Sequence, residues 1–114
     1  MESRLGLIGG KPSRLKSRIL KQNGIQSRHY AINAGGEAEF WNYELAANAV
    51  ANVLKNSQLS PKDVEFLAAA TSQSDLLAPG FASLVHGASG LPPCEIASFQ
   101  SVCAGGMMDF TGGF

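Results

Sequence analysis

The sequence predicts an α/β fold in which helices alternate with buried strands that pair in parallel. Two continuous apolar runs, at residues 64–70 and 94–99, have the length and composition of strands buried on both faces. Helical patterns at residues 42–56 and 80–88 precede these two runs. Because strands that alternate with helices favour parallel pairing, we expect one sheet flanked by helices. The 114 residues, 45% of them hydrophobic, correspond to one small domain.

The amino-terminal third carries weaker structural signals. Ser13 is predicted to cap a short helix over residues 14–22, which the pair Asn23-Gly24 ends. Residues 25–32 alternate loosely between apolar and polar, which favours an extended segment, and residues 34–36 form a loop.

The central helix is predicted from local signals. Asn42 is expected to cap a helix that extends to Asn56, with Glu44 favourably placed in its first turn. Its apolar positions recur at helical spacing, at Ala46, Val50, Val53 and Leu54. Pro61 is expected at the first position of a short capped turn over residues 60–63, just before the first strand.

The next helix separates the two strands. Residues 80–88 place four apolar side chains on one helix face, namely Phe81, Leu84, Val85 and Ala88. The segment Gly90-Leu91-Pro92-Pro93 ends this helix, and the second strand follows. Cys94 lies inside that predicted strand and is interpreted as a core residue.

Cys103 follows the second strand, at the predicted turn into another helix. The partial positive charge at the amino end of a helix favours thiolate over thiol, and the thiolate is the form that attacks acyl carbonyls. Gly105 and Gly106 would let a ligand approach the backbone, whose amides can stabilise an oxyanion. A single cysteine in an apolar context is more often an inert core residue, so the local pattern alone leaves both interpretations open.

Residues 97–108, around Cys103, resemble the nucleophile region of the β-ketoacyl-acyl-carrier-protein synthase III family, in the thiolase superfamily. That family carries Cys-Ala-Gly or Cys-Ser-Gly at the start of a buried helix. Residues 23–30 resemble its T-G-I-x-x-R segment, and residues 67–72 resemble its V-V-A-T-T-S strand end. Residues 79–90 match the segment that follows. The order and spacing of these motifs together make the resemblance specific.

The resemblance implies a fold and an activity. Residues 1–114 would form part of the first half of a thiolase-like, five-layered fold of two similar halves, with a mixed sheet and flanking helices. The implied enzyme is a 3-oxoacyl-acyl-carrier-protein synthase III-like acyltransferase that performs a decarboxylative Claisen condensation in fatty-acid or polyketide-type biosynthesis. Cys103 would hold the acyl group as a thioester, and the backbone of Ala104, Gly105 and Gly106 would stabilise the oxyanion. The family's His and Asn, which stabilise the enolate formed on decarboxylation, belong to the second half and have no counterpart here.

The resemblance also implies substrates and partners. Acyl groups would arrive as coenzyme A or phosphopantetheine thioesters, with no bound cofactor and no metal. The partners would be an acyl carrier protein, the acyl-thioester substrate and, at full length, a second copy of the chain in a homodimer. Leu76, Leu77 and Ala78 align near a loop that reaches the partner's acyl pocket in the family's dimers. The alternative for these three residues is an ordinary loop between strand and helix.

Charge is unevenly distributed along the chain, although the formal net charge is zero. Residues 1–30 hold seven Lys/Arg and one acid, whereas residues 31–114 hold two Lys and eight acids. Arg14, Arg18 and Arg28 are therefore candidates for binding coenzyme phosphates or an acidic carrier protein. A solvated helix face is the alternative. The zero net charge argues against nucleic acid as the main partner.

The chain departs from the family pattern in three places. Arg18 and Gln22 replace the tryptophan and arginine that often sandwich the adenine of coenzyme A, so a carrier-bound acyl donor is as strongly expected. The family's opening strand is missing, which suggests that Met1 is an internal start. Residues 109–114 hold two glycines and a charge, which oppose a long buried helix and suggest a chain cut short after the nucleophile. The amino-terminal region, including residues 9–13, is most similar to members from aryl-polyene and dialkylresorcinol pathways.

Two other functions stay open from the sequence. One is a non-catalytic chain that acts only by association. The other is a small cysteine hydrolase that pairs Cys103 with His29 or His86, which is weaker because no third group stands at a recognisable spacing to orient the histidine. Two cysteines do not make a disulfide framework, and no apolar run approaches the roughly 18 residues of a membrane span. A cytoplasmic protein without a membrane span is therefore expected.

Overall fold

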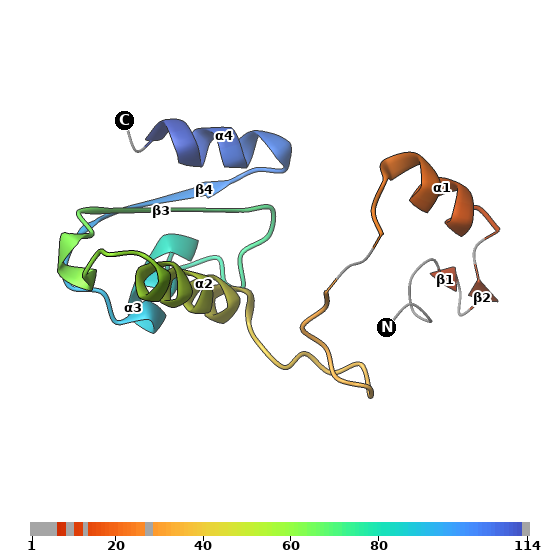
Figure 1. The fold of residues 1–114 in the computed structure, drawn as a ribbon, viewed down its shortest axis with the longest axis horizontal. Coiled ribbons are helices and arrows are strands. Elements are labelled where there is room, and N and C mark those ends of the chain that lie inside the picture. Colours follow the sequence, from red (N-terminus) through yellow and green to blue (C-terminus); the bar gives the residue numbers. More distant parts are fainter. Residues whose placement is uncertain (1–6, 9–10, 13, 27–28, 113–114) are drawn as a thin grey trace. The chain divides into compact units, whose positions relative to one another are not determined.

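The computed structural model describes residues 7–8, 11–12, 14–26 and 29–112 of the chain. The chain forms two compact units, Met1–Glu39 and Phe40–Phe114. Figure 1 labels the elements of both.

The first unit holds a small hairpin and one helix. Strands β1 (Leu7–Ile8) and β2 (Lys11–Pro12) pair antiparallel. Helix α1 spans Lys16–Asn23 and ends at Gly24, whose φ of 67° is the left-handed conformation that glycine adopts without strain. The helix begins two residues later than predicted, and the predicted cap Ser13 lies outside the described residues.

The second unit contains the predicted α/β arrangement. In chain order it comprises α2 (Asn42–Asn56), the 3-10 helix η2 (Pro61–Asp63), β3 (Phe66–Thr71), α3 (Phe81–Ser89), β4 (Glu95–Gln100) and α4 (Cys103–Gly112). Strands β3 and β4 pair in parallel, in a register that runs from Phe66 opposite Glu95 to Thr71 opposite Gln100. Helix α3 packs on one face of this sheet, α4 packs on the other, and α2 packs on α3 (Figure 1). The predicted α/β class with parallel pairing is therefore confirmed.

The hydrophobic core lies between α3 and the sheet. Ala82 and Val85 of α3 are almost completely buried, at 0% and 1% exposure. Phe81 of the same helix, Leu67 and Ala69 of β3, and Leu91 of the connection to β4 complete the cluster. Each fully buried large apolar side chain contributes about 1.5–3 kcal/mol. This cluster therefore fixes the position of α3 on the β3–β4 sheet, whose second strand leads to Cys103.

Burial differs from the prediction at several positions. Strand β4 is not buried on both faces as predicted, because its residues alternate between exposed and half-buried and Ile96 is 42% exposed. Among the described residues β4 pairs with β3 alone, so one of its edges stays open. Ala88 is exposed and Ala82 takes its place in the core. Cys94 lies one residue before β4 and packs half-buried against the core.

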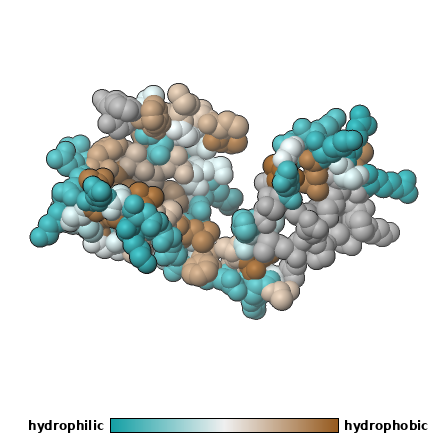
Figure 2. All heavy atoms as spheres, viewed as in Figure 1, coloured by the Kyte–Doolittle hydropathy of each residue, from teal (hydrophilic) through white to brown (hydrophobic). Residues whose placement is uncertain are grey.

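Helix α4 also differs from the prediction. The predicted interruption at residues 109–114 is not seen within the described part, because α4 continues through Asp109 to Gly112. The Thr111 hydroxyl donates to the Met107 carbonyl oxygen at 2.8 Å, which provides a local hydrogen bond in the last turn. Apolar side chains of α4 are exposed, with Met107 at 64% and Phe110 at 65%. Figure 2 shows this apolar surface over α4.

The start of α3 is fixed by a residue of the neighbouring strand. The Ala82 N–H donates to the Ser98 hydroxyl oxygen at 2.9 Å. A methyl group added at Gly80 would stand 2.8 Å from that same oxygen. Gly80 is therefore required by the close approach of β4 to the helix start.

We expect Gly80→Ala and Ser98→Ala each to lower the free energy of unfolding by about 1 kcal/mol, since each removes the hydrogen bond to Ala82. The double variant is expected to lose less than the sum, because the bond can be lost only once. Urea denaturation at one protein concentration measures the free energy of unfolding of the two single variants and the double variant. Gly87→Ala in the same helix is the control, where the added methyl meets nothing within 4 Å and an increase of about 0.5–1 kcal/mol is expected. If the double variant lost the full sum of the two single losses of unfolding free energy, the two substitutions would not act through the same hydrogen bond.

Candidate active site

Cys103 is the first residue of α4 and lies three residues beyond the end of β4. The Ser101 N–H donates to the Thr71 carbonyl oxygen at 3.2 Å, which extends the parallel pairing past β4 to the turn before Cys103. Ligands of open α/β sheets bind at the carboxyl ends of the strands. The predicted strand-to-helix turn is present, and it stands at this end of the β3–β4 pair.

A hollow of about 320 Å³ surrounds this turn. Its walls come from the two segments that end the strands. Ala70, Thr71 and Ser72 form one wall, and the other is made by Ser101, Val102, Cys103, Gly105 and Gly106. Cys103 is exposed, so its sulfur is accessible to a substrate.

The first turn of α4 supplies free backbone donors beside the sulfur. An α-helix leaves its first N–H groups without an intrahelical acceptor, which in α4 are those of Cys103, Ala104 and Gly105. The N–H of Gly106 is the first in the helix with an intrahelical acceptor in the regular pattern, so it is already paired. Of the three residues predicted to stabilise an oxyanion, Ala104 and Gly105 therefore have N–H groups without an intrahelical acceptor.

The two glycines of the site have different surroundings. Gly105 is buried, and a methyl group there would stand 3.6 Å from the Ser101 Cβ and 3.8 Å from the Ala70 Cβ. Gly106 is exposed, and a methyl group there would meet nothing within 4 Å. A methyl group at Gly105 would therefore make ordinary van der Waals contacts with the end of the sheet, whereas the space beside Gly106 is open.

A hydrogen-bonded cluster that the sequence did not predict lies behind the Thr71 wall. We call Asn42, Thr71, Gln73 and Asp75 the strand-end cluster. The Asp75 carboxylate accepts from the N–H groups of Asn42 and Tyr43, at 2.7 and 2.9 Å. The Asn42 side-chain amide donates to the Thr71 hydroxyl oxygen at 3.0 Å and to the Gln73 carbonyl oxygen at 3.1 Å.

The prediction that Asn42 caps α2 is wrong. Asn42 is the first residue of the helix, and the cap comes from Asp75, 33 positions further along the chain. The polar run Thr71-Ser72-Gln73-Ser74-Asp75 directly after a strand was the available sequence signal. It indicated a turn, but not which helix the turn would contact.

Comparison with known proteins places this geometry in a family. No family model matches the chain. Over 87 residues, 76% of this chain, it is 37% identical to β-ketoacyl-acyl-carrier-protein synthase III of Cereibacter sphaeroides and 33% identical to that of Jannaschia sp.. It is 31% identical over 104 residues, 91% of the chain, to β-ketoacyl-acyl-carrier-protein synthase III 2 of Streptomyces avermitilis. The chain belongs to the β-ketoacyl-acyl-carrier-protein synthase III family.

A solved structure supports the same assignment for the fold. The tetronic acid condensing enzyme AbyA1 matches 90% of this chain with a TM-score of 0.73 and 25% identity, over 32% of its own length. The predicted thiolase-like fold is therefore confirmed. The chain spans 25% of the Cereibacter sphaeroides and Jannaschia sp. synthases and 30% of the Streptomyces avermitilis synthase.

The loop between β3 and α3 carries the predicted acyl-pocket residues of this synthase III homologue. Leu77 is fully exposed, at 102%, and Leu76 is half exposed, at 50%. Neither they nor Ala78 lines the hollow around Cys103. Asp75 and the other cluster residues fix the start of this loop, so Leu76 and Leu77 project from an anchored base.

The predicted basic residues lie in the first unit. Arg14 and Arg18 are exposed, and Arg18 lies within α1. Arg28 lies outside the described residues. Lys21 is exposed in the last turn of the same helix, so α1 presents Arg18 and Lys21 to solvent.

Neither histidine lines the Cys103 hollow. His86 is half-buried, and its Nε2 lies 3.0 Å from the Pro92 carbonyl oxygen, so that nitrogen donates. This bond ties the end of α3 to the following turn, which gives His86 a structural contact. His29 is exposed in the first unit.

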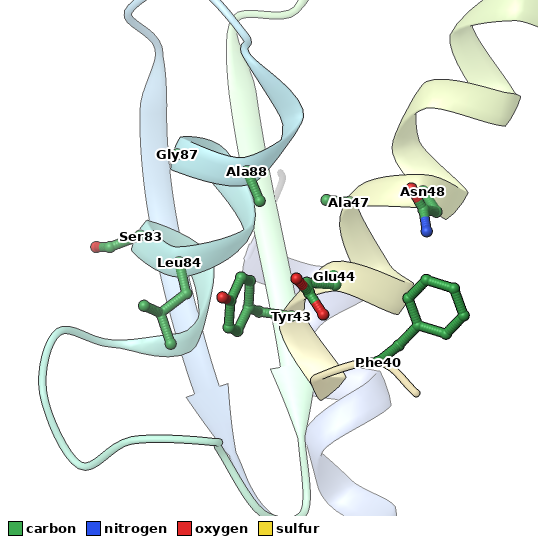
Figure 3. Close-up of a pocket in the computed structure, with 9 residues that line it drawn as sticks. All are labelled: Phe40, Tyr43, Glu44, Ala47, Asn48, Ser83, Leu84, Gly87 and Ala88. Atoms are coloured by element: carbon green, nitrogen blue, oxygen red, sulfur yellow. The ribbon is translucent and has the colours of Figure 1, made fainter. Parts of the chain in front are cut away.

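A larger pocket of about 570 Å³ lies between α2 and α3. Figure 3 shows Tyr43 and Glu44 of α2 and Leu84 of α3 among its lining residues. Glu44 already accepts from the Trp41 N–H at 2.8 Å. The residues that line this pocket include no cysteine or histidine. In the part of the chain that the structure describes, no cluster of three or more His, Cys, Asp or Glu could hold a metal ion. No described helix is long and apolar enough to cross a membrane.

Proposed function

We propose that Cys103 is the acyl-accepting nucleophile of a condensing enzyme in this family. One observation carries the proposal: an exposed cysteine begins a helix at the carboxyl end of a parallel strand pair, beside a hollow with free backbone amides. That arrangement brings together a nucleophile, an oxyanion site and room for a substrate.

The first half-reaction is acyl transfer. The Cys103 thiolate attacks the carbonyl carbon of an acyl thioester, and the N–H groups of Ala104 and Gly105 stabilise the oxyanion. The new C–S bond forms as the bond to the pantetheine sulfur breaks. The departing sulfur takes up a proton and leaves as a thiol, and the acyl group stays on Cys103. Coenzyme A or a carrier-bound phosphopantetheine would supply this thioester.

The second half-reaction forms a carbon–carbon bond. A malonyl thioester on an acyl carrier protein loses CO₂, and the resulting enolate attacks the acyl carbonyl held by Cys103. The C–S bond to Cys103 breaks and the ketoacyl product leaves on the carrier. The described residues that line the hollow include no histidine or asparagine, so stabilisation of the enolate relies on other groups. This chemistry assigns the enzyme to fatty-acid or polyketide-type biosynthesis.

The exposed loop between β3 and α3 is the proposed contact with a partner. Leu76, Leu77 and Ala78 would contact the acyl pocket of a second copy in a homodimer, which fits their exposure on an anchored loop. The protein would act in the cytoplasm, where its two free cysteines stay reduced.

Acyl loading tests the proposal. Incubation of the protein with an acyl-coenzyme A, followed by peptide mapping, is expected to place the acyl group on Cys103. An unmodified Cys103 after prolonged incubation would contradict the nucleophile assignment.

The carrier or coenzyme is proposed to bind the basic amino-terminal third. We expect charge reversal at Arg14, Arg18 and Arg28 together to weaken carrier binding about tenfold or more at low salt, with a smaller loss at high salt, because screening reduces charge attraction. Binding titrations at two ionic strengths measure this effect. The control is reversal of Lys55 and Lys62, the two lysines of the acidic remainder of the chain. Unchanged affinity after the triple reversal would make the basic run a solvated face.

A further inference from the structure

The strand-end cluster connects the start of α2 to the turn that carries Cys103. Thr71 is the shared residue. Its hydroxyl accepts from the Asn42 side chain and donates to the Gln73 carbonyl oxygen at 2.9 Å. Its own carbonyl oxygen accepts from Ser101 N–H, two residues before Cys103. Thr71 also lines the Cys103 hollow.

We propose that Asn42 and Asp75 are positioning residues for the Cys103 site. The inference rests on the proposed function of Cys103. Asp75 holds the first two amides of α2, and Asn42 then holds Thr71 and the backbone at Gln73. Thr71 is hydrogen-bonded to Asn42 through its hydroxyl and to Ser101 through its carbonyl oxygen. The cluster therefore sets the distance between the Thr71–Ser72 wall and the turn at Cys103.

The strand-end cluster contains more hydrogen bonds than the cap of α2 requires. The Asp75 carboxylate alone caps α2, because it accepts from the backbone N–H groups of both Asn42 and Tyr43. The two bonds of the Asn42 side chain are directed to the end of β3 and add nothing to that cap. Their effect is on the strand end, which forms a wall of the hollow.

The chain supplies a matched control residue. Asp63 accepts from the Ser60 N–H at 2.6 Å at the start of η2, so it is also a carboxylate that caps a helix start, although within its own turn. It does not line the Cys103 hollow, and the bonds of Thr71 do not involve it. Loss of Asp63 should therefore lower stability without disturbing the site.

The experiment compares Asn42→Ala, Asp75→Ala and Asp75→Asn with Asp63→Ala in the 114-residue protein. The first readout is hydrogen exchange at the Ser101 amide, under conditions where urea titration shows equal global stability. We expect exchange about tenfold faster in Asn42→Ala and Asp75→Ala, and unchanged in Asp63→Ala. Asp75→Asn keeps one acceptor oxygen and is expected to be intermediate. Asn42→Ala leaves the Asp75 cap in place, so it remains informative if Asp75→Ala does not fold.

The second readout is the rate of acyl loading of Cys103 from an acyl-coenzyme A. We expect the maximal rate to fall about tenfold in Asn42→Ala while the half-saturating donor concentration changes less, since misplacement of the turn disturbs the reaction geometry. Asp63→Ala should stay within about twofold of the wild type. Equal Ser101 exchange in Asn42→Ala and Asp63→Ala would overturn the positioning role. If wild-type Cys103 takes up no acyl group, the proposed function fails, and Ser101 exchange still decides the role of the cluster.

Discussion

Cys103→Ala is expected to abolish acyl loading of the protein, whereas Cys94→Ala should retain it. Cys103 is exposed in a hollow beside free helix amides, and Cys94 is half-buried against the core. A thioester can form only where the sulfur reaches the acyl carbonyl and the oxyanion finds donors. Intact mass measurement and peptide mapping after incubation with an acyl-coenzyme A compare both variants. An adduct that persists in Cys103→Ala would assign the chemistry to another group.

Cys103 and Cys94 should also differ in their reactivity toward iodoacetamide at neutral pH. This reagent reacts with a thiol without recognition of an acyl chain. We expect Cys103 to be alkylated about tenfold faster than Cys94, because burial protects a thiol from the reagent. In urea both sulfurs become exposed, so the ratio should approach one and serves as the control. Equal or reversed rates in the native protein would count against Cys103 as the nucleophile.

Elements with local signals were predicted from the sequence. Helix α2 spans the predicted 42–56, and the capped turn at Pro61 is present. The turn at Cys103 could be predicted because an apolar strand run ends just before this residue and small residues follow it. The fold class followed from the alternation of such elements.

Features that depend on distant contacts could not be predicted in the same way. The cap of α2 comes from Asp75, and no local pattern pairs a helix with a turn 33 residues away. Burial was also misjudged, since β4 has an apolar composition but exposes Ile96, and Val53 of α2 is 65% exposed. Apolar composition shows that a residue can be buried, whereas the number of neighbouring layers decides whether it is.

The 114-residue protein is expected to form no ketoacyl product, although we expect its Cys103 to be acylated. A thiolate and two amides supply only part of the barrier reduction, because groups that act as a unit lose most of their effect when some are missing. The described residues that line the hollow provide no histidine or asparagine for the enolate. An assay with acyl donor and malonyl-carrier, followed by mass spectrometry of the carrier, tests this. Turnover that depends on Cys103 in a folded monomer would overturn it and would show that other residues of this chain supply the missing step.

The same protein is expected to self-associate in solution. Helix α4 exposes Met107 and Phe110, and the open edge of β4 offers unpaired backbone groups for another strand. Light scattering coupled to size exclusion should report a mass above that of the 12.0 kDa chain, falling on dilution. Met107→Glu with Phe110→Glu should shift the protein toward monomer, because charge on that surface opposes contact with a second apolar face. Val53→Glu, at an equally exposed apolar position on α2, is the matched control and should leave the association unchanged. A monomeric wild-type protein at the highest concentration tested would show that neither surface drives association.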